Sequence, residues 1–297
     1  MSFLNAPLIC PFCGSALTQI KRRLACANDH SFDIAREGYV NLLRPYKKMH
    51  NLGDGKEMLR ARRAFLQRGH YAAISTAINR VVVDFMARGE RNEPNWVADM
   101  GCGEGYYLHQ LTQHLPDTDR CCGFDISKEA VRLAARQNKQ GAFAAVNINR
   151  QIPLASQSIH VLLNLFAPRN ASEFARVLAP GGVLIVVIPT EEHLHEWRTA
   201  LAQQGATPLP IAAEKQRRTE EQFTDAFEPF LFEQSALKPW HVQNVCYTIQ
   251  LDRTDLENLL QMTPNAWHIS PTHQQQARQL AQMYTTVSVQ ILTFRRR

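Results

Sequence analysis

Four residues of metal-binding type lie close together near the start of this 297-residue chain. Two residues separate Cys10 from Cys13 and three separate Cys26 from His30, so the spacing is C-x2-C-x12-C-x3-H. Two such pairs can hold three thiolates and one imidazole around a tetrahedral zinc ion. Because four protein ligands fill that shell, we expect a structural zinc site with no position left for water.

The alternative to a zinc site is a chance grouping of unrelated cysteines with a surface histidine. Within the zinc interpretation, Asp29 or Asp33 could replace His30 as the fourth ligand. Seven cysteines, an odd number in a long chain, fit thiols or metal ligands better than a disulfide framework. We expect the remaining four to be small buried apolar residues: Cys102, Cys121, Cys122 and Cys246.

A glycine-rich loop is the second feature that could carry chemistry. The stretch from Asp99 to Gly105 reads DMGCGEG, follows a predicted strand and opens a predicted helix. Glycines let the backbone pass close under a ligand, and the N-terminus of the helix then faces that ligand. Asp125 ends the next predicted strand, where a carboxylate can accept both hydroxyls of a ribose.

The spacing of this loop is G-x-G-x-G, with an acid two residues before the first glycine, whereas dinucleotide-binding loops read G-x-G-x-x-G. The compact form resembles the first motif of class I S-adenosylmethionine-dependent methyltransferases, whose cofactor carries a positive sulfonium and an ammonium group. By this resemblance, the cofactor-binding residues are Asp99, Gly101, Gly103, Glu104 and Asp125. An NAD-binding fold or an inactive relic is the alternative.

Alternating strands and helices must position these residues. We expect strands at 96–100, 120–124, 142–146, 159–165 and 183–188, and helices at 57–68, 71–87, 106–114, 127–137 and 172–178. Such alternation implies right-handed βαβ units and a doubly wound parallel sheet. The expected fold is therefore α/β. By the resemblance of the glycine loop, it is the Rossmann-like sheet of a class I S-adenosylmethionine-dependent methyltransferase, with a small N-terminal zinc-binding domain.

The remaining segments complete the predicted organisation. Residues 36–55 look irregular, and residues 205–235 look like an insertion over one edge of the sheet. Further along, the patterns predict a strand at 242–251, helices at 255–262 and 272–283, and a last strand at 285–294 near the sheet edge. We expect a zinc ribbon at 1–36, a basic linker with helices at 37–90, and the methyltransferase domain at 91–297.

Positive charge is concentrated in the first quarter of the chain. Residues 1–70 carry 12 Lys and Arg and 5 acids, a net of +7, while the other 227 residues carry 21 and 22, a net of −1. A basic segment suggests an acidic partner, with nucleic acid as the leading candidate and a solvated surface as the alternative. We expect Arg62, Arg63 and Lys47 to bind RNA without affecting cofactor affinity.

Several further stretches resemble one family more narrowly. They are FDIAREGYVNLL at 32–43, GDGKEM at 53–58, ARRAFL at 61–66, GHY at 69–71, GCGEGYY at 101–107 and QMTP at 261–264. With the ribbon, they resemble the bacterial 23S rRNA (guanine-N1)-methyltransferase family over essentially the whole chain. The resemblance implies S-adenosyl-L-methionine as methyl donor, N1 of a guanine in a 23S rRNA hairpin loop as acceptor, and a ribbon that helps to bind RNA.

The resemblance also assigns residues. It implies that Tyr71 and His193 contact the cofactor, and that Phe166 and Pro168 line the acceptor pocket. Phe166 could stack a flipped base there, or be only a core residue. N1 of guanine must lose its proton before it attacks, but the sequence does not identify a residue that would act as the general base.

Two other functions remain open at this point, because a fold does not fix a substrate. One is a small-molecule S-adenosylmethionine-dependent methyltransferase with a structural zinc ribbon, and the other a non-enzymatic RNA-binding protein on a decayed scaffold.

No apolar run reaches the roughly 18 residues of a membrane span, and the N-terminus does not resemble a signal peptide. We therefore expect a cytoplasmic protein. A homodimer is expected by family analogy only.

Overall fold

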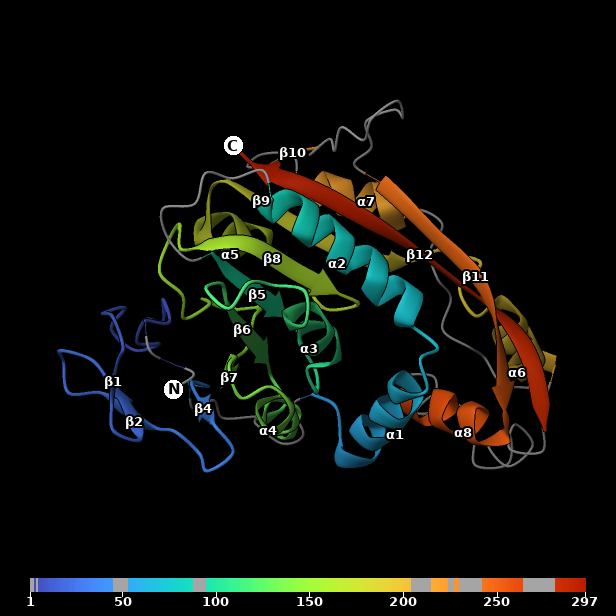
Figure 1. Cartoon of the computed structure of the whole chain (residues 1–297), viewed down its shortest axis with the longest axis horizontal. Coiled ribbons are helices and arrows are strands. Elements are labelled where there is room, and N and C mark those ends of the chain that lie inside the picture. The colour runs from blue at the N-terminus through green and yellow to red at the C-terminus, as the bar shows by residue number, and fades with distance from the viewer. Residues whose placement is uncertain are drawn as a thin grey trace.

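A nine-stranded mixed sheet lies at the centre of the computed structural model (Figure 1). The structure describes residues 3, 5–44, 53–87, 95–203, 215–223, 227–229, 242–263 and 281–297. The strand order is β10-β12-β9-β8-β5-β6-β7-β4, with β11 also paired to β12. The strands are β4 (Tyr39–Asn41), β5 (Trp96–Met100), β6 (Arg120–Asp125), β7 (Ala142–Ala145), β8 (Ile159–Leu165), β9 (Leu178–Pro189), β10 (Phe227–Pro229), β11 (Val242–Asp252) and β12 (Gln282–Arg296).

The strands from β4 to β9 are parallel, which confirms the predicted βαβ core. Their carboxyl ends therefore meet at one edge, where residues that follow β5, β6 and β8 come together. The predicted parallel sheet is extended by antiparallel strands, because β12 runs antiparallel to β9, and β10 and β11 run antiparallel to β12.

The last strand lies near the sheet edge, as expected, because β12 pairs with β9 on one side and with β10 and β11 on the other. Two other local expectations need correction. The segment 36–55 is not wholly irregular, since β4 pairs with β7. Most of the predicted helix at 272–283 lies outside the described residues, but its last two residues, Gln282 and Met283, belong to β12.

Helices cover both faces of the sheet (Figure 1). They are α1 (Lys56–Gln67), α2 (Ala72–Met86), α3 (Tyr106–Thr112), α4 (Lys128–Gln137), α5 (Ala171–Val177), α6 (His195–Gln203), α7 (Lys215–Gln222) and α8 (Arg253–Met262). Buried side chains of α2, α3, α4, α6 and α8 form one hydrophobic cluster with one face of the strands. Side chains of α5 belong to a second cluster, on the opposite face. None of the helices that the structure describes is both long and apolar enough to cross a membrane.

The N-terminal segment packs onto this second face rather than standing apart. It contains a three-stranded antiparallel sheet of β1 (Thr18–Ile20), β2 (Arg23–Ala25) and β3 (Ser31–Asp33). Leu8, Cys10 and Leu24 lie in the same buried cluster as α5, and Leu8 also forms a β-bridge with Leu154. The N-terminal sheet therefore shares a core with the large sheet.

The ring of Phe143 fills a space that glycines leave open beneath the carboxyl edge of the sheet. A Cβ atom added to Gly123 would lie 2.7 Å from this ring, and one added to Gly141 would also lie 2.7 Å from it. Phe143 itself has no exposed surface. Packing at this position is therefore complete, with no space for an added methyl group.

We expect Gly123→Ala to lower the free energy of unfolding by about 1–3 kcal/mol, the usual cost of overpacking a core. The measurement is urea unfolding. Gly55→Ala is the matched control, because a Cβ at Gly55 meets nothing within 4 Å and its φ is −71°. A second change, Phe143→Leu, should restore part of the loss in the Gly123→Ala variant. Equal stability of Gly123→Ala and the control would contradict the packing described.

Candidate active site and zinc cluster

Cys10, Cys13, Cys26 and His30 meet in one cluster, with ligand atoms that all lie within 4.8 Å of one another. The sulfur atoms of Cys13 and Cys26 are 3.7 Å apart, and Nδ1 of His30 is 3.5 Å from the sulfur of Cys26. Tetrahedral zinc with bonds of about 2.3 Å to sulfur places two sulfurs about 3.8 Å apart. The observed donor set and spacing therefore fit a closed structural zinc site.

Local turns bring these ligands together. The backbone N–H of Cys26 donates to the carbonyl of His30 over 3.0 Å, in the turn between β2 and β3. Hydrogen bonding with the Ser15 side chain lowers the pKa of Cys13 to about 5, which favours the thiolate that binds metal. Among the residues that the structure describes, neither Asp29 nor Asp33 joins the cluster.

The glycine loop joins β5 to α3 with an unusual backbone. Gly101, Gly103 and Gly105 all have positive φ, at 91°, 54° and 86°. A Cβ at Gly101 would lie only 2.4 Å from that of Ala167, so the loop passes directly against the segment that follows β8. These positions require glycine, and they leave the N-terminus of α3 at the carboxyl edge of the sheet.

Asp125 ties the glycine loop to the next helix. Its Oδ2 accepts the N–H of Gly103 over 3.0 Å, and its Oδ1 accepts the N–H of Ser127 over 2.8 Å. Ser127 caps α4, because its side chain accepts the N–H of Ala130. Asp125 is thus held at the end of β6, at the position expected from the sequence.

Three carboxyl groups lie together around this loop, with Asp99 and Glu104 buried and Asp125 partly buried. Asp99 and Glu104 are 1% and 3% exposed. Burial raises the pKa of Asp99 to about 8, with further contributions from the charges of Asp125 and Glu104. Burial likewise raises the pKa of Glu104 and of Asp125. Among the described residues, Oδ1 of Asp99 has no hydrogen-bond partner, so the cluster is suited to a cationic ligand.

Aromatic rings gather beside the loop, around Phe166. This residue follows β8, is 42% exposed and has a φ of 55°, which is strained for a bulky side chain. The centroid of its ring lies 6.3 Å from that of Tyr71, 6.5 Å from that of Tyr107 and 6.2 Å from that of His193. Phe166 is therefore not a core residue, and its exposed ring is available to a flat ligand.

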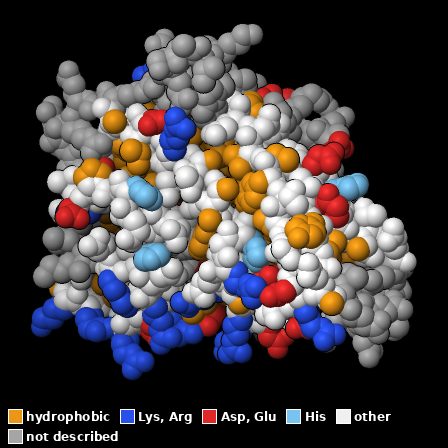
Figure 2. Space-filling model, turned by 45° about the vertical axis from the view of Figure 1, so that its right-hand side comes forward, with side chains coloured by type: hydrophobic (Ala, Val, Ile, Leu, Met, Phe, Trp, Pro, Cys, Tyr) orange, Lys and Arg blue, Asp and Glu red, His pale blue; other side chains and the backbone are white. Residues whose placement is uncertain are grey.

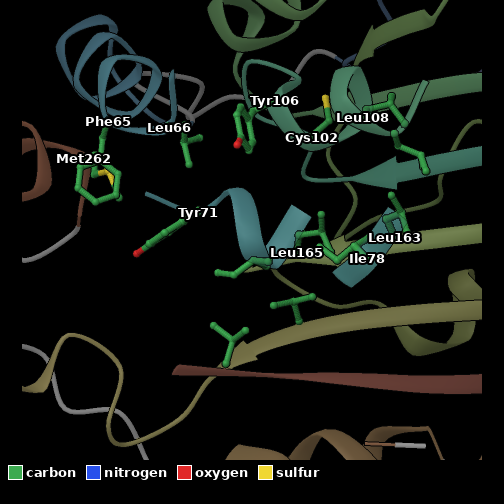
Figure 3. Packing of buried hydrophobic residues seen from close by; sticks show 14 of the residues in the cluster. Phe65, Leu66, Tyr71, Ile78, Cys102, Tyr106, Leu108, Leu163, Leu165 and Met262 are labelled. Carbon is green, nitrogen blue, oxygen red and sulfur yellow. The ribbon is translucent and has the colours of Figure 1, made fainter. Parts of the chain in front are cut away.

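Tyr71 and His193, far apart in the sequence, are hydrogen-bonded to each other. The N–H of Ser288 donates to Nδ1 of His193 over 3.2 Å, so the ring proton of a neutral His193 is on Nε2. Nε2 then donates to the hydroxyl oxygen of Tyr71 over 3.1 Å, which leaves the phenol proton for another acceptor. In Figure 3 the phenol of Tyr71 extends away from the aliphatic side chains around it.

The side chain of Asn164, near the end of β8, holds the segment that follows this strand in place. Nδ2 of Asn164 donates to the carbonyls of Met100 and Pro168, over 3.1 and 2.8 Å. The side chain of Asn164 is fully buried, whereas Pro168 is exposed. The Asn164 amide thus joins the end of β5 to the loop that carries Phe166.

The structure places Arg62 at the glycine loop. Its guanidinium forms an ion pair with Asp54 and donates to the carbonyl of Met262, which joins α1 to the end of α8. An added Cβ on Gly103 would lie 3.9 Å from Nη1 of Arg62. Figure 3 shows the α1 residue Phe65 next to Met262.

The charges of Arg62 and Arg63 both lower the pKa of Glu104, opposing its burial. These two arginines of the basic segment therefore act electrostatically on the glycine loop, and their expected role in binding RNA without affecting cofactor affinity stays a prediction. Lys47, expected to act with them, lies outside the described residues.

Of the four remaining cysteines, the expected burial is confirmed for Cys102, Cys121 and Cys122 and wrong for Cys246. Cys246 lies on β11, whose side chains alternate between exposed and partly buried positions. Sequence reasoning did not select Asp54, Tyr107 or Ser288 as site residues. Two signals could have indicated the first two, because Asp54 lies in the GDG stretch and Tyr107 is the second tyrosine after the glycine loop.

We expect Cys26→Ser to lose bound zinc and to lower the thermal stability of the whole chain, because Cys10 of the same cluster lies in the shared core. Zinc content is measured by atomic emission and unfolding by calorimetry. Cys246→Ser is the control, since this exposed cysteine lies outside the cluster. Full zinc content in the Cys26→Ser variant would show that the metal is held in another way.

Comparison with known families identifies both parts of the chain. A zinc-ribbon family described as "RlmA, N-terminal" matches residues 8–50, and one described as "Methyltransferase domain" matches residues 97–182. A trans-aconitate 2-methyltransferase from Afipia carboxidovorans is 30% identical, but over only 41% of this chain and 49% of its own length.

Two longer relatives match both parts together. The 23S rRNA (guanine(748)-N(1))-methyltransferase of Streptomyces fradiae is 35% identical over 93% of this chain and 90% of its own length. A relative from Micromonospora griseorubida, provisionally named a 23S rRNA (guanine-N(1)-)-methyltransferase, is 38% identical over 89% of this chain and 88% of its own. With its zinc ribbon and methyltransferase fold, the chain belongs to the 23S rRNA (guanine-N1)-methyltransferase family.

Proposed function

We propose that this chain transfers a methyl group from S-adenosyl-L-methionine to N1 of a guanine in a hairpin loop of 23S rRNA. The observation that carries the proposal is the match to 23S rRNA (guanine-N1)-methyltransferases over about nine-tenths of the chain, ribbon included. The carboxyl cluster supplies a site for the methyl donor, and the exposed ring of Phe166 beside it supplies a site for the acceptor base.

The carboxyl edge of the sheet suits this cofactor. When bound, S-adenosylmethionine supplies an electrophilic methyl group on a positive sulfonium, and the buried acids compensate its positive charges. We assign the cofactor site to Tyr71, Asp99, Gly101, Gly103, Glu104, Asp125 and His193. Asp125 is placed for the ribose hydroxyls, because it ends the strand next to the glycine loop.

The acceptor base is proposed to stack on Phe166, with Pro168 at the rim of the pocket. Methyl transfer forms a bond from N1 of guanine to the methyl carbon and breaks the bond from that carbon to sulfur, while the N1 proton leaves. Alignment of the two reactants supplies much of the rate of such a displacement. The bonds from Asn164 to the carbonyls of Met100 and Pro168 hold the pocket against β5, and no residue is assigned as general base.

A basic rim is the proposed contact with the RNA backbone. Figure 2 shows Lys and Arg side chains along the lower edge of one face. The ribbon, α4 and α1 all lie in the lower part of Figure 1. They also lie in the lower part of Figure 2, because that view is turned about the vertical axis only. Their exposed bases include Arg23, Arg60, Lys128 and Arg136. Arg62 and Arg63 would extend this rim to the mouth of the cofactor site.

The organisation proposed from the sequence completes this assignment. The zinc is structural, held by Cys10, Cys13, Cys26 and His30. We propose the division into a ribbon at 1–36, a basic connecting segment at 37–90 and a methyltransferase domain at 91–297. Because the proposed substrate is ribosomal RNA, we infer a cytoplasmic location. The homodimer stays a prediction.

We expect the protein to methylate 23S rRNA that lacks the modification, and to leave unchanged an RNA whose target N1 is already methylated. Primer extension maps the product, because a methyl group on N1 blocks base pairing. Asp125→Asn is expected to slow transfer strongly, since it weakens the proposed hold on the ribose.

The alternative is a small-molecule methyltransferase, as the partial match to a trans-aconitate 2-methyltransferase would suggest. It predicts turnover of the cofactor with a small acid in the absence of RNA. Transfer to trans-aconitate but not to rRNA, by zinc-loaded and folded protein, would overturn the proposal.

Cofactor binding should release a proton. Asp99 is largely protonated in the free protein below about pH 8, and a cationic ligand favours its ionised form. Affinity is therefore expected to increase with pH up to about 8, by at most about tenfold per pH unit, and then to level off. Calorimetry at pH 7 in buffers of different ionisation enthalpy measures the released proton, and Asp99→Asn should remove most of it. An unchanged proton release in this variant would assign the effect to another group.

A further inference from the structure

An aromatic stack lies at the surface of the zinc ribbon, away from the carboxyl edge of the large sheet. The ring of Phe12 stacks on that of His30, with centroids 5.3 Å apart and an interplanar angle of 28°. It also lies nearly parallel to the ring of Phe32, at 6.0 Å and 7°. Phe12 is nevertheless 45% exposed, so this large apolar ring remains open to a partner.

The orientation of Phe12 is fixed by its surroundings. It stands between the zinc ligands Cys10 and Cys13 in sequence, and of its two ring neighbours His30 belongs to the cluster and Phe32 to β3. A rigid ring loses little entropy when a second flat group stacks on it. The ring is therefore preorganised for stacking rather than for a deformable apolar contact.

The basic side chains of the ribbon favour a nucleic acid over an apolar protein surface. The guanidinium of Arg44 lies 5.7 Å from the centroid of the Phe12 ring. Elsewhere on the ribbon, Lys21 and Arg22 are exposed in the turn between β1 and β2, and Arg23 is exposed at the start of β2. Aromatic rings set among cations bind unpaired bases by stacking, while the cations bind the phosphates.

We propose that Phe12 is a stacking platform for one unpaired base of the RNA substrate, at a position separate from the methylated guanine. The inference rests on the proposed function and deepens it, because it names how the ribbon holds RNA. Each basic side chain contributes through the release of counterions, which salt suppresses, but a stacked base contributes almost independently of salt. Substituting Phe12 and substituting an arginine of the ribbon should therefore change the salt dependence of RNA binding differently.

The test measures binding of unmodified 23S rRNA across a range of salt concentrations. Phe12→Ala is expected to weaken binding by about tenfold, in line with the loss of one stacked base, with an unchanged slope of log affinity against log salt. Phe12→Trp should restore binding. Arg23→Ala should instead make the slope shallower by about one unit.

Ile20→Ala is the matched control, since Ile20 is 47% exposed on the same ribbon and is not aromatic; it should bind RNA like the wild type. Zinc content and cofactor affinity are measured for every variant. If Phe12→Ala loses zinc, Phe12→Leu replaces it, because leucine preserves apolar packing but cannot stack. Wild-type RNA affinity in a zinc-loaded Phe12 variant would overturn the inference, while a wild-type protein that binds and methylates no rRNA would overturn the proposed function instead.

Discussion

The gathering of three carboxyl groups at one edge of the sheet, two of them buried, is the constraint on which the rest of the site depends. Asp99, Glu104 and Asp125 lie together in a region where desolvation and mutual repulsion raise their pKa values. Unpaired buried charge is costly, so the fold surrounds the cluster with compensating groups. Backbone N–H groups of Gly103 and Ser127 bind Asp125, and the guanidinium of Arg62 contributes positive charge. The cationic cofactor completes this compensation when it binds.

The same requirement explains why distant segments converge on the glycine loop. Arg62 reaches the loop from α1 and is held there by Asp54 and by the carbonyl of Met262 at the end of α8. Asn164 joins the end of β5 to the loop that carries Phe166. A strained residue such as Phe166 persists only where its surroundings fix it. The loop that carries Phe166, the proposed acceptor side of the site, is thus held against the strand that leads into the glycine loop.

The zinc ribbon is part of the same folded unit rather than an appendage. Its buried side chains share a cluster with the second face of the sheet, and Cys10 belongs both to that cluster and to the metal-binding group. Metal binding at such a position stabilises the surrounding fold directly. The same ribbon also carries the exposed ring of Phe12 and exposed basic side chains.

The sequence by itself determined the features that depend on local spacing. The four zinc-binding residues, the glycine loop, the acid at the end of β6 and the βαβ alternation are all visible within short windows, because turns and periodicity are local properties. Only the tertiary structure decided the long-range relations. It brought Tyr71 to His193, placed Arg62 of the basic segment beside the glycine loop, paired β12 antiparallel to β9, and exposed Cys246 on β11. The physical reason is that pairing between strands and packing between helices depend on which surfaces meet. A short stretch of sequence does not specify which distant segment it will contact.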